Sequence, residues 1–327
     1  MHVLVTGAAG FIGYHLSEAL LRQGARVTGV DNLNAYYEVS LKEARLHNLR
    51  QHKGFDFVQL DIADRAPMLA LAGKLKNATH IAHLAAQAGV RHSLTDPYTY
   101  VMSNVMGQVV MLELARLLPQ LQHFVYASSS SVYGANTKFP FSIEDETEQP
   151  NSLYAATKKS DELIARTYAH LYGIKATGLR FFTVYGPYGR PDMAAFLFTK
   201  AILAGEPIKV FNNGETWRDF TYIDDIVAGL IAALKHLPKV TPPHTVYNLG
   251  NHRSEKLTDF IATLEQALGK KAQMKFEPMQ PGDVPKTFAD IDASRRDLGF
   301  EPKTPISEGI PRFVEWYKNY YRVWPKN

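Results

Sequence analysis

The stretch VLVTGAAGFIG, residues 3–13, decides the fold of this chain. A short β-branched run leads directly into three glycines spaced as G-x-x-G-x-x-G, which are Gly7, Gly10 and Gly13, and a segment of helical period follows. Glycine permits a tight turn and a close approach of the backbone to a pyrophosphate, while the helix N-terminus offers amide donors and a positive dipole. A merely flexible turn is the alternative, but the position between a strand and a helix favours a dinucleotide-binding turn.

A carboxylate follows at the distance that such a turn requires. Asp31 ends the second expected strand, 18 residues after Gly13, where it can accept hydrogen bonds from an adenosine ribose and repel a 2′-phosphate. Taken alone, Asp31 could equally be a helix cap; together with the glycines it favours NAD over NADP. Asp61 and Ile62 follow the third expected strand and could flank the adenine, although an aspartate after a strand is also common in turns.

Most of the chain alternates between strand-like and helix-like segments. Short β-branched runs and longer runs of helical period follow one another, as is typical of parallel strands covered by helices. We expect strands at 3–6, 26–30, 56–60, 80–84, 123–127 and 176–181, and helices at 11–23, 41–51, 97–118 and 153–172. The predicted fold is therefore α/β: a doubly wound parallel (Rossmann) sheet with a smaller α/β substrate-binding domain.

The rhythm breaks after residue 182. Pieces such as VYGPYGRPD, NNGETWRDF and MQPGDVP are punctuated by glycine and proline, which indicates a smaller domain over the carboxyl edge of the sheet. The short apolar run 246–249 is expected to return to the main sheet. We predict an NAD-binding domain at 1–182, to which 219–250 returns, and a substrate-binding domain at 183–327.

The clearest chemical signal is a tyrosine and a lysine four residues apart. Tyr154 and Lys158 lie on one face of the expected helix 153–172. A tyrosine is a poor base at pH 7, because the ordinary pKa of a phenol is about 10, but a nearby ammonium and a cationic nicotinamide stabilise a phenolate. The serine run 128–131 lies at the carboxyl end of a strand, where doubly wound sheets bind their ligands. In isolation the Tyr/Lys pair is more often a surface pair; combined with the serines and glycines it indicates catalysis.

At this point the chain resembles the extended short-chain dehydrogenase/reductase family, in particular its NAD-dependent nucleotide-sugar 4-epimerases. The motifs with family counterparts are VTGAAGFIG, HLAAQAGVR, ASSSSVYG, YAATKK, RFFTVYGPYGRPD, RDFTYIDD and PGD. The resemblance implies that Ser129 is the catalytic hydroxyl, Tyr154 the base and Lys158 the group that binds the nicotinamide ribose. The cofactor contacts that we expect are Gly7, Gly10, Phe11, Ile12, Gly13, Asp31, Asn32, Asp61, Ile62, Ala85, Ala86, Asn104, Ser128, Tyr154, Lys158 and Phe181.

Two serines indicate to which branch of the family the chain is most similar. Dehydratases of the family carry an Asp-Glu pair where this chain has Ser130 and Ser131, and the related decarboxylases usually carry a glutamate at the second position. The segments 183–192 and 218–225 look most like UDP-glucuronate 4-epimerases. That resemblance implies reversible C4 epimerisation of UDP-glucuronate to UDP-galacturonate. A neutral UDP-sugar 4-epimerase, a UDP-glucuronate decarboxylase and a non-catalytic NAD-binding protein are the alternatives.

The resemblance also implies a set of substrate contacts. Thr183 and Arg190 correspond to residues associated with the sugar carboxylate, for which an arginine fork is suited, and Arg218 corresponds to a diphosphate-binding arginine. Each of these residues has a structural alternative. Arg190 could be an exposed loop residue, and Arg218 could pair with Asp219 or Asp224. Arg91 could be an ordinary loop arginine, and Asp283 an aspartate of a turn that needs no ligand. The expected substrate contacts are Arg91, Ser129, Ser130, Thr183, Arg190, Arg218 and Asp283.

Composition limits the remaining possibilities. The 327 residues include no cysteine, which excludes disulfides, thiolate catalysis and Cys-ligated metals. The net charge is +4, from 36 Lys+Arg and 32 Asp+Glu, and no basic run reaches five residues, which argues against nucleic-acid binding. With neither a signal peptide nor a membrane span recognisable, we expect a cytoplasmic protein. His80 and His83 lack a third ligand at metal-site spacing, so no metal is assigned.

The oligomeric state is also predicted. The segments 97–118 and 153–172 carry more apolar positions than one sheet face can bury. In the family such helices pair across a two-fold axis as a four-helix bundle, so we expect a homodimer.

Overall fold

Seven parallel strands form the central sheet of the structure, a computed structural model that describes residues 1–280 and 282–323. Their order is β11-β6-β5-β4-β1-β2-β3. The strands are β1 (His2–Thr6), β2 (Arg26–Asp31), β3 (Phe55–Gln59), β4 (His80–His83), β5 (His123–Ser129), β6 (Ala176–Phe181) and β11 (His244–Leu249). Every residue of β1 and of β6 is buried, as expected for strands covered on both faces. The doubly wound parallel sheet predicted from the sequence is confirmed.

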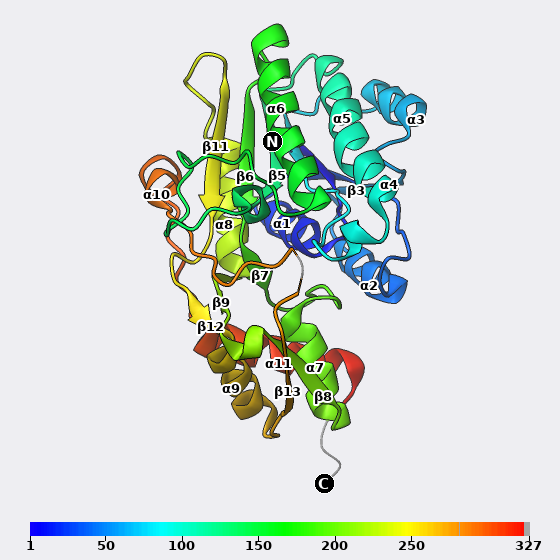
Figure 1. Cartoon of the computed structure of the whole chain (residues 1–327). Coiled ribbons are helices and arrows are strands. Elements are labelled where there is room, and N and C mark those ends of the chain that lie inside the picture. Colours follow the sequence, from blue (N-terminus) through cyan, green and yellow to red (C-terminus); the bar gives the residue numbers. More distant parts are fainter. Residues whose placement is uncertain (281, 324–327) are drawn as a thin grey trace.

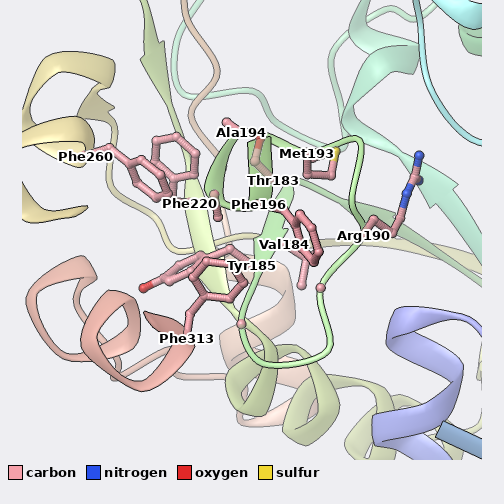
Figure 2. Close-up of a pocket in the computed structure, with 13 residues that line it drawn as sticks. Thr183, Val184, Tyr185, Arg190, Met193, Ala194, Phe196, Phe220, Phe260 and Phe313 are labelled. Carbon is pink, nitrogen blue, oxygen red and sulfur yellow. The ribbon is translucent and has the colours of Figure 1, made fainter. Parts of the chain in front are cut away.

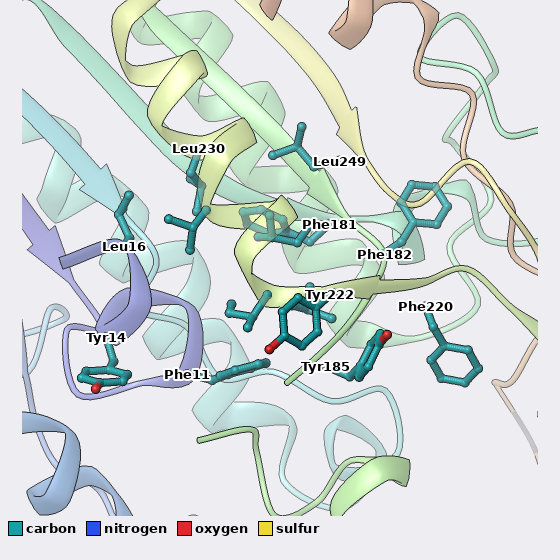
Figure 3. Packing of buried hydrophobic residues seen from close by; sticks show 14 of the residues in the cluster. Phe11, Tyr14, Leu16, Phe181, Phe182, Tyr185, Phe220, Tyr222, Leu230 and Leu249 are labelled. Carbon is teal, nitrogen blue, oxygen red and sulfur yellow. The ribbon is translucent and has the colours of Figure 1, made fainter. Parts of the chain in front are cut away.

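Helices cover both faces of this sheet and bury a hydrophobic core on each (Figure 1). On one face lie α1 (Phe11–Arg22), α2 (Val39–Leu49) and α8 (Ile223–Lys235), which contribute Leu16, Leu46 and Leu230 to a shared cluster. Figure 3 shows this cluster continuing from α1 and α8 toward Tyr185 and Phe220, at the carboxyl edge. The opposite face carries α3 (Arg65–Ala70), α5 (Gly107–Arg116) and α6 (Leu153–Tyr172).

The segment 97–118 is not the single helix that we expected. It is divided into α4 (Pro97–Tyr100), a π-helical turn at Val101–Met106, and α5. A π turn adds one residue to a helical turn and changes which side chains face inward. The spacing of apolar residues in the sequence does not predict such a turn. Here the turn buries Asn104, which is 1% exposed.

The remaining elements form a smaller part below the carboxyl edge of the sheet (Figure 1). Its strands pair two by two: β7 (Thr183–Tyr185) with β10 (Phe220–Tyr222), β9 (Trp217–Arg218) with β12 (Glu255–Lys256), and β8 (Pro207–Phe211) with β13 (Gln273–Glu277). The helices of this part are α7 (Ala194–Ala204), α9 (Leu257–Leu268) and α11 (Ile306–Tyr321), whereas α10 (Asp292–Leu298) packs against β11 and α8 beside the main sheet. Among the described residues, no helix is both long and apolar enough to cross a bilayer.

An aromatic contact and a buried carboxylate help to hold the smaller part against the sheet. The ring of Tyr188 packs between Tyr14 of α1 and Trp316 of α11, with centroid distances of 5.1 and 5.0 Å. Asp219 is fully buried, and its carboxylate accepts the backbone N–H groups of Asn251 and Ala289, which are remote in sequence. Burial raises the pKa of Asp219 to about 6, against the opposing effect of these donors. The Asp219 carboxylate is therefore a buried polar anchor at the junction of the two parts.

Buried histidines lie at the amino ends of the parallel strands. His123 of β5 hydrogen-bonds Thr177 through Nε2 at 2.8 Å, and His244 of β11 hydrogen-bonds the hydroxyl of Tyr126 at 2.9 Å. Burial lowers the pKa of both imidazoles to about 4. The structure therefore holds them as neutral rings at physiological pH. No group of three His, Asp or Glu side chains suited to a metal occurs in the part of the chain that the structure describes.

Candidate active site

A cleft of about 1350 Å³ runs along the carboxyl ends of the strands and continues between the sheet and the smaller part. This is the edge at which open α/β sheets bind their ligands. All but one of the residues predicted as contacts line it. Those lining it are Gly7, Gly10, Phe11, Ile12, Gly13, Asp31, Asn32, Asp61, Ile62, Ala85, Ala86, Arg91, Ser128, Ser129, Ser130, Tyr154, Lys158, Phe181, Thr183, Arg190, Arg218 and Asp283.

The glycine turn leaves no space for a side chain at Gly7 or Gly13. Gly7 has φ +71°, and a Cβ built on it would lie 2.9 Å from the backbone nitrogen of Ala85. A Cβ on Gly13 would lie 2.0 Å from the carbonyl oxygen of Gly7. Helix α1 begins immediately after Gly10, and no side chain caps its first amides. The turn therefore offers unblocked N–H donors to an anion, and these residues fit the pyrophosphate of a dinucleotide.

Asp31 is fixed by the same turn. Its Oδ2 accepts the N–H of Ala9 at 3.1 Å and its Oδ1 accepts the N–H of Leu33 at 2.9 Å. A carboxylate oxygen can accept more than one hydrogen bond, so capacity remains for the hydroxyls of a ribose. Nearby, Asn32 donates to Asp61 at 2.7 Å, which joins the ends of β2 and β3. These contacts support a rigid adenosine site.

One lysine in this region was not predicted. Lys42 of α2 lines the cleft, is 4% exposed, and donates to the backbone and side-chain oxygens of Asn34 at 2.8 and 2.9 Å. Burial lowers its pKa, while the charge of Asp31 acts in the opposite direction. The only signal in the sequence is a lysine on the expected helix 41–51, and a lysine there usually faces solvent.

The expected catalytic residues come from two neighbouring elements. Ser129 is the last residue of β5, and its Oγ accepts the N–H of Ser131 at 3.1 Å. Tyr154 is in the first turn of α6, which Ser152 caps by accepting the N–H of Ala155 at 3.1 Å. The Tyr154 ring is half-buried and packs edge-on against Tyr100. The strand end and the helix start thus present both hydroxyls to one cleft.

Lys158, one turn further along α6, is almost fully buried at the cleft wall. Its Nζ donates to the carbonyl oxygen of Ala127 at 2.9 Å and to Oδ2 of Asp161 at 3.0 Å. An ammonium has three N–H groups, so one remains for a ligand in the cleft.

A second ion pair lies behind the serine run. Arg180 of β6 donates to both oxygens of Glu162 at 2.8 and 2.9 Å, and the Ser128 hydroxyl donates to Glu162 at 2.6 Å. Burial alone would raise the pKa of Glu162, but Arg180 and Ser128 lower it. The hydroxyl of Ser128 is therefore engaged inside the protein, although the residue lines the cleft.

Arg190 has a partner inside the protein. Its Nε and Nη2 donate to the two carboxylate oxygens of Asp192 at 3.0 and 2.5 Å, and Tyr36 also donates to Asp192 at 3.3 Å. Figure 2 shows the guanidinium projecting away from the aromatic rings of Phe220, Phe260 and Phe313. Arg190 is 22% exposed in this pair, so its fork is accessible but already occupied by a carboxylate.

The other predicted arginines differ from one another. Arg91 pairs with Asp283 at 3.0 Å, so these two predicted substrate contacts meet each other across the cleft. Arg218 donates to the backbone oxygens of Trp217 and Pro285 at 3.0 and 3.3 Å. Within the described residues it forms no ion pair with Asp219 or Asp224, so its charge is not neutralised by either of the carboxylates considered for it.

Asn104 is the one predicted contact that does not line the cleft. Its Oδ1 accepts the N–H of Gln87 at 2.8 Å, and its Nδ2 donates to Gln87 O and to Thr157 Oγ1. The π turn directs this amide into the protein, where it supports the strand-end loop 84–91 from behind. Gln87 and Ser103 line the cleft instead.

Comparison with known proteins agrees with this geometry. The family model described as "NAD dependent epimerase/dehydratase family" matches residues 3–250. The chain is 50% identical to UDP-glucuronate 4-epimerase 4 of Arabidopsis thaliana (98% of this chain, 76% of the relative) and 46% identical to a probable UDP-glucuronate 4-epimerase of Rhizobium meliloti (98% of each). Its structure is similar to that of UDP-glucuronic acid 4-epimerase from Bacillus cereus in complex with UDP-glucuronic acid and NAD. The TM-score is 0.91 at 36% identity, over 98% of this chain and 100% of that one.

Proposed function

Because the chain belongs to the NAD-dependent epimerase/dehydratase family, we propose that it interconverts UDP-glucuronate and UDP-galacturonate by epimerisation at C4. The observation that carries this proposal is the presence of Arg190 and Thr183 in the same cleft as Ser129, Tyr154 and Lys158. Relatives named as UDP-glucuronate 4-epimerases, and the binding of UDP-glucuronic acid and NAD by the Bacillus cereus enzyme, support the choice of substrate.

The residues of the chain divide the chemistry between them. Bound NAD supplies the hydride acceptor and donor for C4. Ser129 holds the C4 hydroxyl and Tyr154 takes its proton as the C4 carbon is oxidised to a ketone. The ammonium of Lys158 holds the nicotinamide ribose and stabilises the phenolate form of Tyr154. The same proton returns from Tyr154 once the keto sugar has turned its opposite face toward the cofactor.

The diphosphate and the sugar carboxylate of the substrate must be bound in different ways. We assign the diphosphate to Arg218, which forms no ion pair with Asp219 or Asp224 among the described residues, so that the nucleotide stays bound while the sugar turns. The 4-keto intermediate carries a carboxylate β to a ketone and loses carbon dioxide when its C–C bond aligns with the carbonyl π system. We assign the restraint of that carboxylate to Thr183 and Arg190. In this assignment residues 1–182 with 219–250 form the NAD-binding domain, and the rest of 183–327 binds the UDP-sugar.

We infer that the active form is a homodimer. Neighbouring helical segments expose several large apolar side chains, and patches of exposed apolar surface mark interaction sites. On α6 they are Leu163 (54% exposed), Leu171 and Tyr172; on α4 and the π turn they are Tyr98 (82% exposed), Val101, Met102 and Met106. Two copies meeting on this face would form a four-helix bundle. A monomer by light scattering at micromolar concentration would contradict the inference, and Leu163→Glu should dissociate the dimer.

Proton NMR of purified protein incubated with UDP-glucuronate, with UDP-glucose in parallel, tests the function. We expect the C1 signal of the galacturonate epimer to appear without a pentose signal. A pentose product would indicate a decarboxylase, faster conversion of UDP-glucose a neutral-sugar epimerase, and no conversion of either a non-catalytic NAD-binding protein. The cytoplasmic location predicted from the sequence is a separate proposal, which cell fractionation tests.

A further inference from the structure

Asp161 forms a buried ion pair with Lys158 that packing alone does not explain. The two residues are three positions apart on α6, their side chains are only 2% and 4% exposed, and Oδ2 lies 3.0 Å from Nζ. The second oxygen, Oδ1, is also buried, yet it has no hydrogen-bond partner among the described residues. A buried ion pair is weak evidence for stability, and an unpaired buried oxygen adds a cost. Such an arrangement calls for a functional explanation.

The nearest charged residues on α6 and β6, Glu162 and Arg180, pair with each other. Glu162, next in the chain, is held by Arg180 of β6 and by Ser128. The charge of Glu162 therefore has its own counter-ion, and Lys158 is left as the counter-ion of Asp161.

The elements that pack against Asp161 from the sheet and from α5 contribute neutral groups. Tyr126 of β5 is fully buried; burial raises its pKa, and the charges of Glu162 and Asp161 raise it further, so it stays a phenol. His83 of β4 also stays neutral, because burial and the charge of Lys158 lower its pKa to about 3. From α5, Gln108 donates to the backbone carbonyl of Asp161 and not to its carboxylate.

We propose that Asp161 is a positioning residue that sets how much of the positive charge of Lys158 acts on Tyr154, and thereby sets the acid limb of the pH–rate profile. This inference rests on the roles given to Tyr154 and Lys158 in the proposed function. When Asp161 is ionised, the Lys158–Asp161 pair is neutral as a whole and stabilises a phenolate weakly. When Asp161 is uncharged, the full charge of Lys158 acts on the phenol and favours loss of its proton.

The position of Asp161 makes both forms accessible. Burial raises the pKa of Asp161 to about 6, and Lys158 opposes that effect only in part. Its carboxylate also orients the ammonium: Ala127 O and Asp161 Oδ2 take two of the three N–H groups and leave the third for the cofactor ribose. Asp161 touches neither substrate nor cofactor in this scheme, and acts through Lys158.

The isosteric variant Asp161→Asn tests the proposal. It keeps an oxygen near Lys158 but removes the charge, so the acid limb of the kcat profile for UDP-glucuronate should move to lower pH by on the order of one unit, with NAD binding retained. Ser160→Ala is the matched control, because the Ser160 hydroxyl donates only to Ala156 O of its own helix, and its profile should match the wild type. A folded Asp161→Asn protein with the acid limb of the wild type would overturn the proposal.

A measurement that does not depend on that variant follows the Asp161 carboxyl carbon by NMR in protein labelled with carbon-13 aspartate. In Lys158→Met the counter-charge is gone, so the titration midpoint of Asp161 should rise relative to the wild type. An unchanged midpoint would show that the pair is not coupled and would overturn the proposal. If the wild type fails to convert UDP-glucuronate at every pH, the proposed function fails, while this titration still decides about the ion pair.

Discussion

Replacing Arg190 with alanine should cost the enzyme its preference for a uronate over a neutral sugar, and leave the chemistry at C4 largely intact. The guanidinium holds a carboxylate bidentately in the structure, with Nε–Oδ1 and Nη2–Oδ2 distances of 3.0 and 2.5 Å to Asp192. We expect the substrate carboxylate to use the same fork. A hydrogen bond to a charged group contributes about 1.5–3 kcal/mol, and two of them, discounted for the partial exposure of Arg190, give about 3 kcal/mol. That corresponds to a loss of roughly 10²-fold in kcat/KM for UDP-glucuronate.

Asp192, which pairs with Arg190, should have a second effect on substrate binding that can be measured separately. In Arg190→Ala the Asp192 carboxylate loses its counter-ion and repels the incoming uronate. The double variant Arg190→Ala/Asp192→Asn removes that repulsion and should recover about tenfold, or about 1.4 kcal/mol, which lies between the values of about 1 kcal/mol in water and about 4 kcal/mol near a protein surface for two charges about 4 Å apart. Arg190→Lys keeps the charge without the fork and should fall between the wild type and Arg190→Ala.

The assay is kcat/KM for UDP-glucuronate and for UDP-glucose, with product measured by proton NMR for each variant. The ratio of the two values isolates the carboxylate, because the C4 chemistry and the UDP contacts are common to both substrates. If Arg190→Ala leaves this ratio at its wild-type value, the assignment of Arg190 to the carboxylate is wrong.

Three further outcomes follow from the geometry. Tyr154→Phe should lower turnover by about 10²–10⁴-fold, the usual range for loss of an acid–base group, and spare NAD binding measured by fluorescence titration; unaltered turnover would rule out the mechanism. Gly13→Ala should weaken NAD binding in the same titration, because its Cβ would lie 2.0 Å from a backbone oxygen, whereas Gly73→Ala, with open space around its Cβ, should bind NAD like the wild type. Acidification should destabilise the fold, because His123 and His244 have folded pKa values of about 4 and ordinary values near 6.5, so the unfolded state takes up their protons first. Stability in urea melts should be full above about pH 6.5 and fall by about 1.4 kcal/mol per histidine per pH unit toward pH 4; a pH-independent midpoint over that range would contradict this reasoning.

Local patterns predicted the parts of the site that local geometry determines. The glycines of the turn could be placed because a Cβ at Gly7 or Gly13 meets backbone atoms, so the spacing has one reasonable structure. Tyr154 and Lys158 could be placed on one face because residues four apart on a helix always share one. These inferences needed only the type of element on which the residues lie.

The carboxylates that pair with Arg190 and Lys158 could not be predicted from the sequence. Asp192 lies in the same motif as Arg190, and Asp161 follows Lys158 by three residues, yet their pairing depends on rotamers and on burial that the spacing does not encode. The π turn is a similar case: the expected helix 97–118 predicted an uninterrupted face, while the extra residue in one turn directs Asn104 into the protein. The sequence predicts which residues line the site, but only the packing of the folded chain determines which of their charges are paired inside the protein.

The position of β11 late in the sequence has a consequence for folding during synthesis. When the ribosome has finished β6, six of the seven strands exist, but the outer edge of β6 has no partner until residues 244–249 emerge. At 5–20 residues per second, synthesis of the intervening segment 182–243 leaves this fully buried strand as an open edge for about 3–12 s. Unpaired apolar edges invite pairing with other chains. A nascent chain cut short within this segment would therefore be prone to aggregate, although it already contains the whole glycine turn, Tyr154 and Lys158.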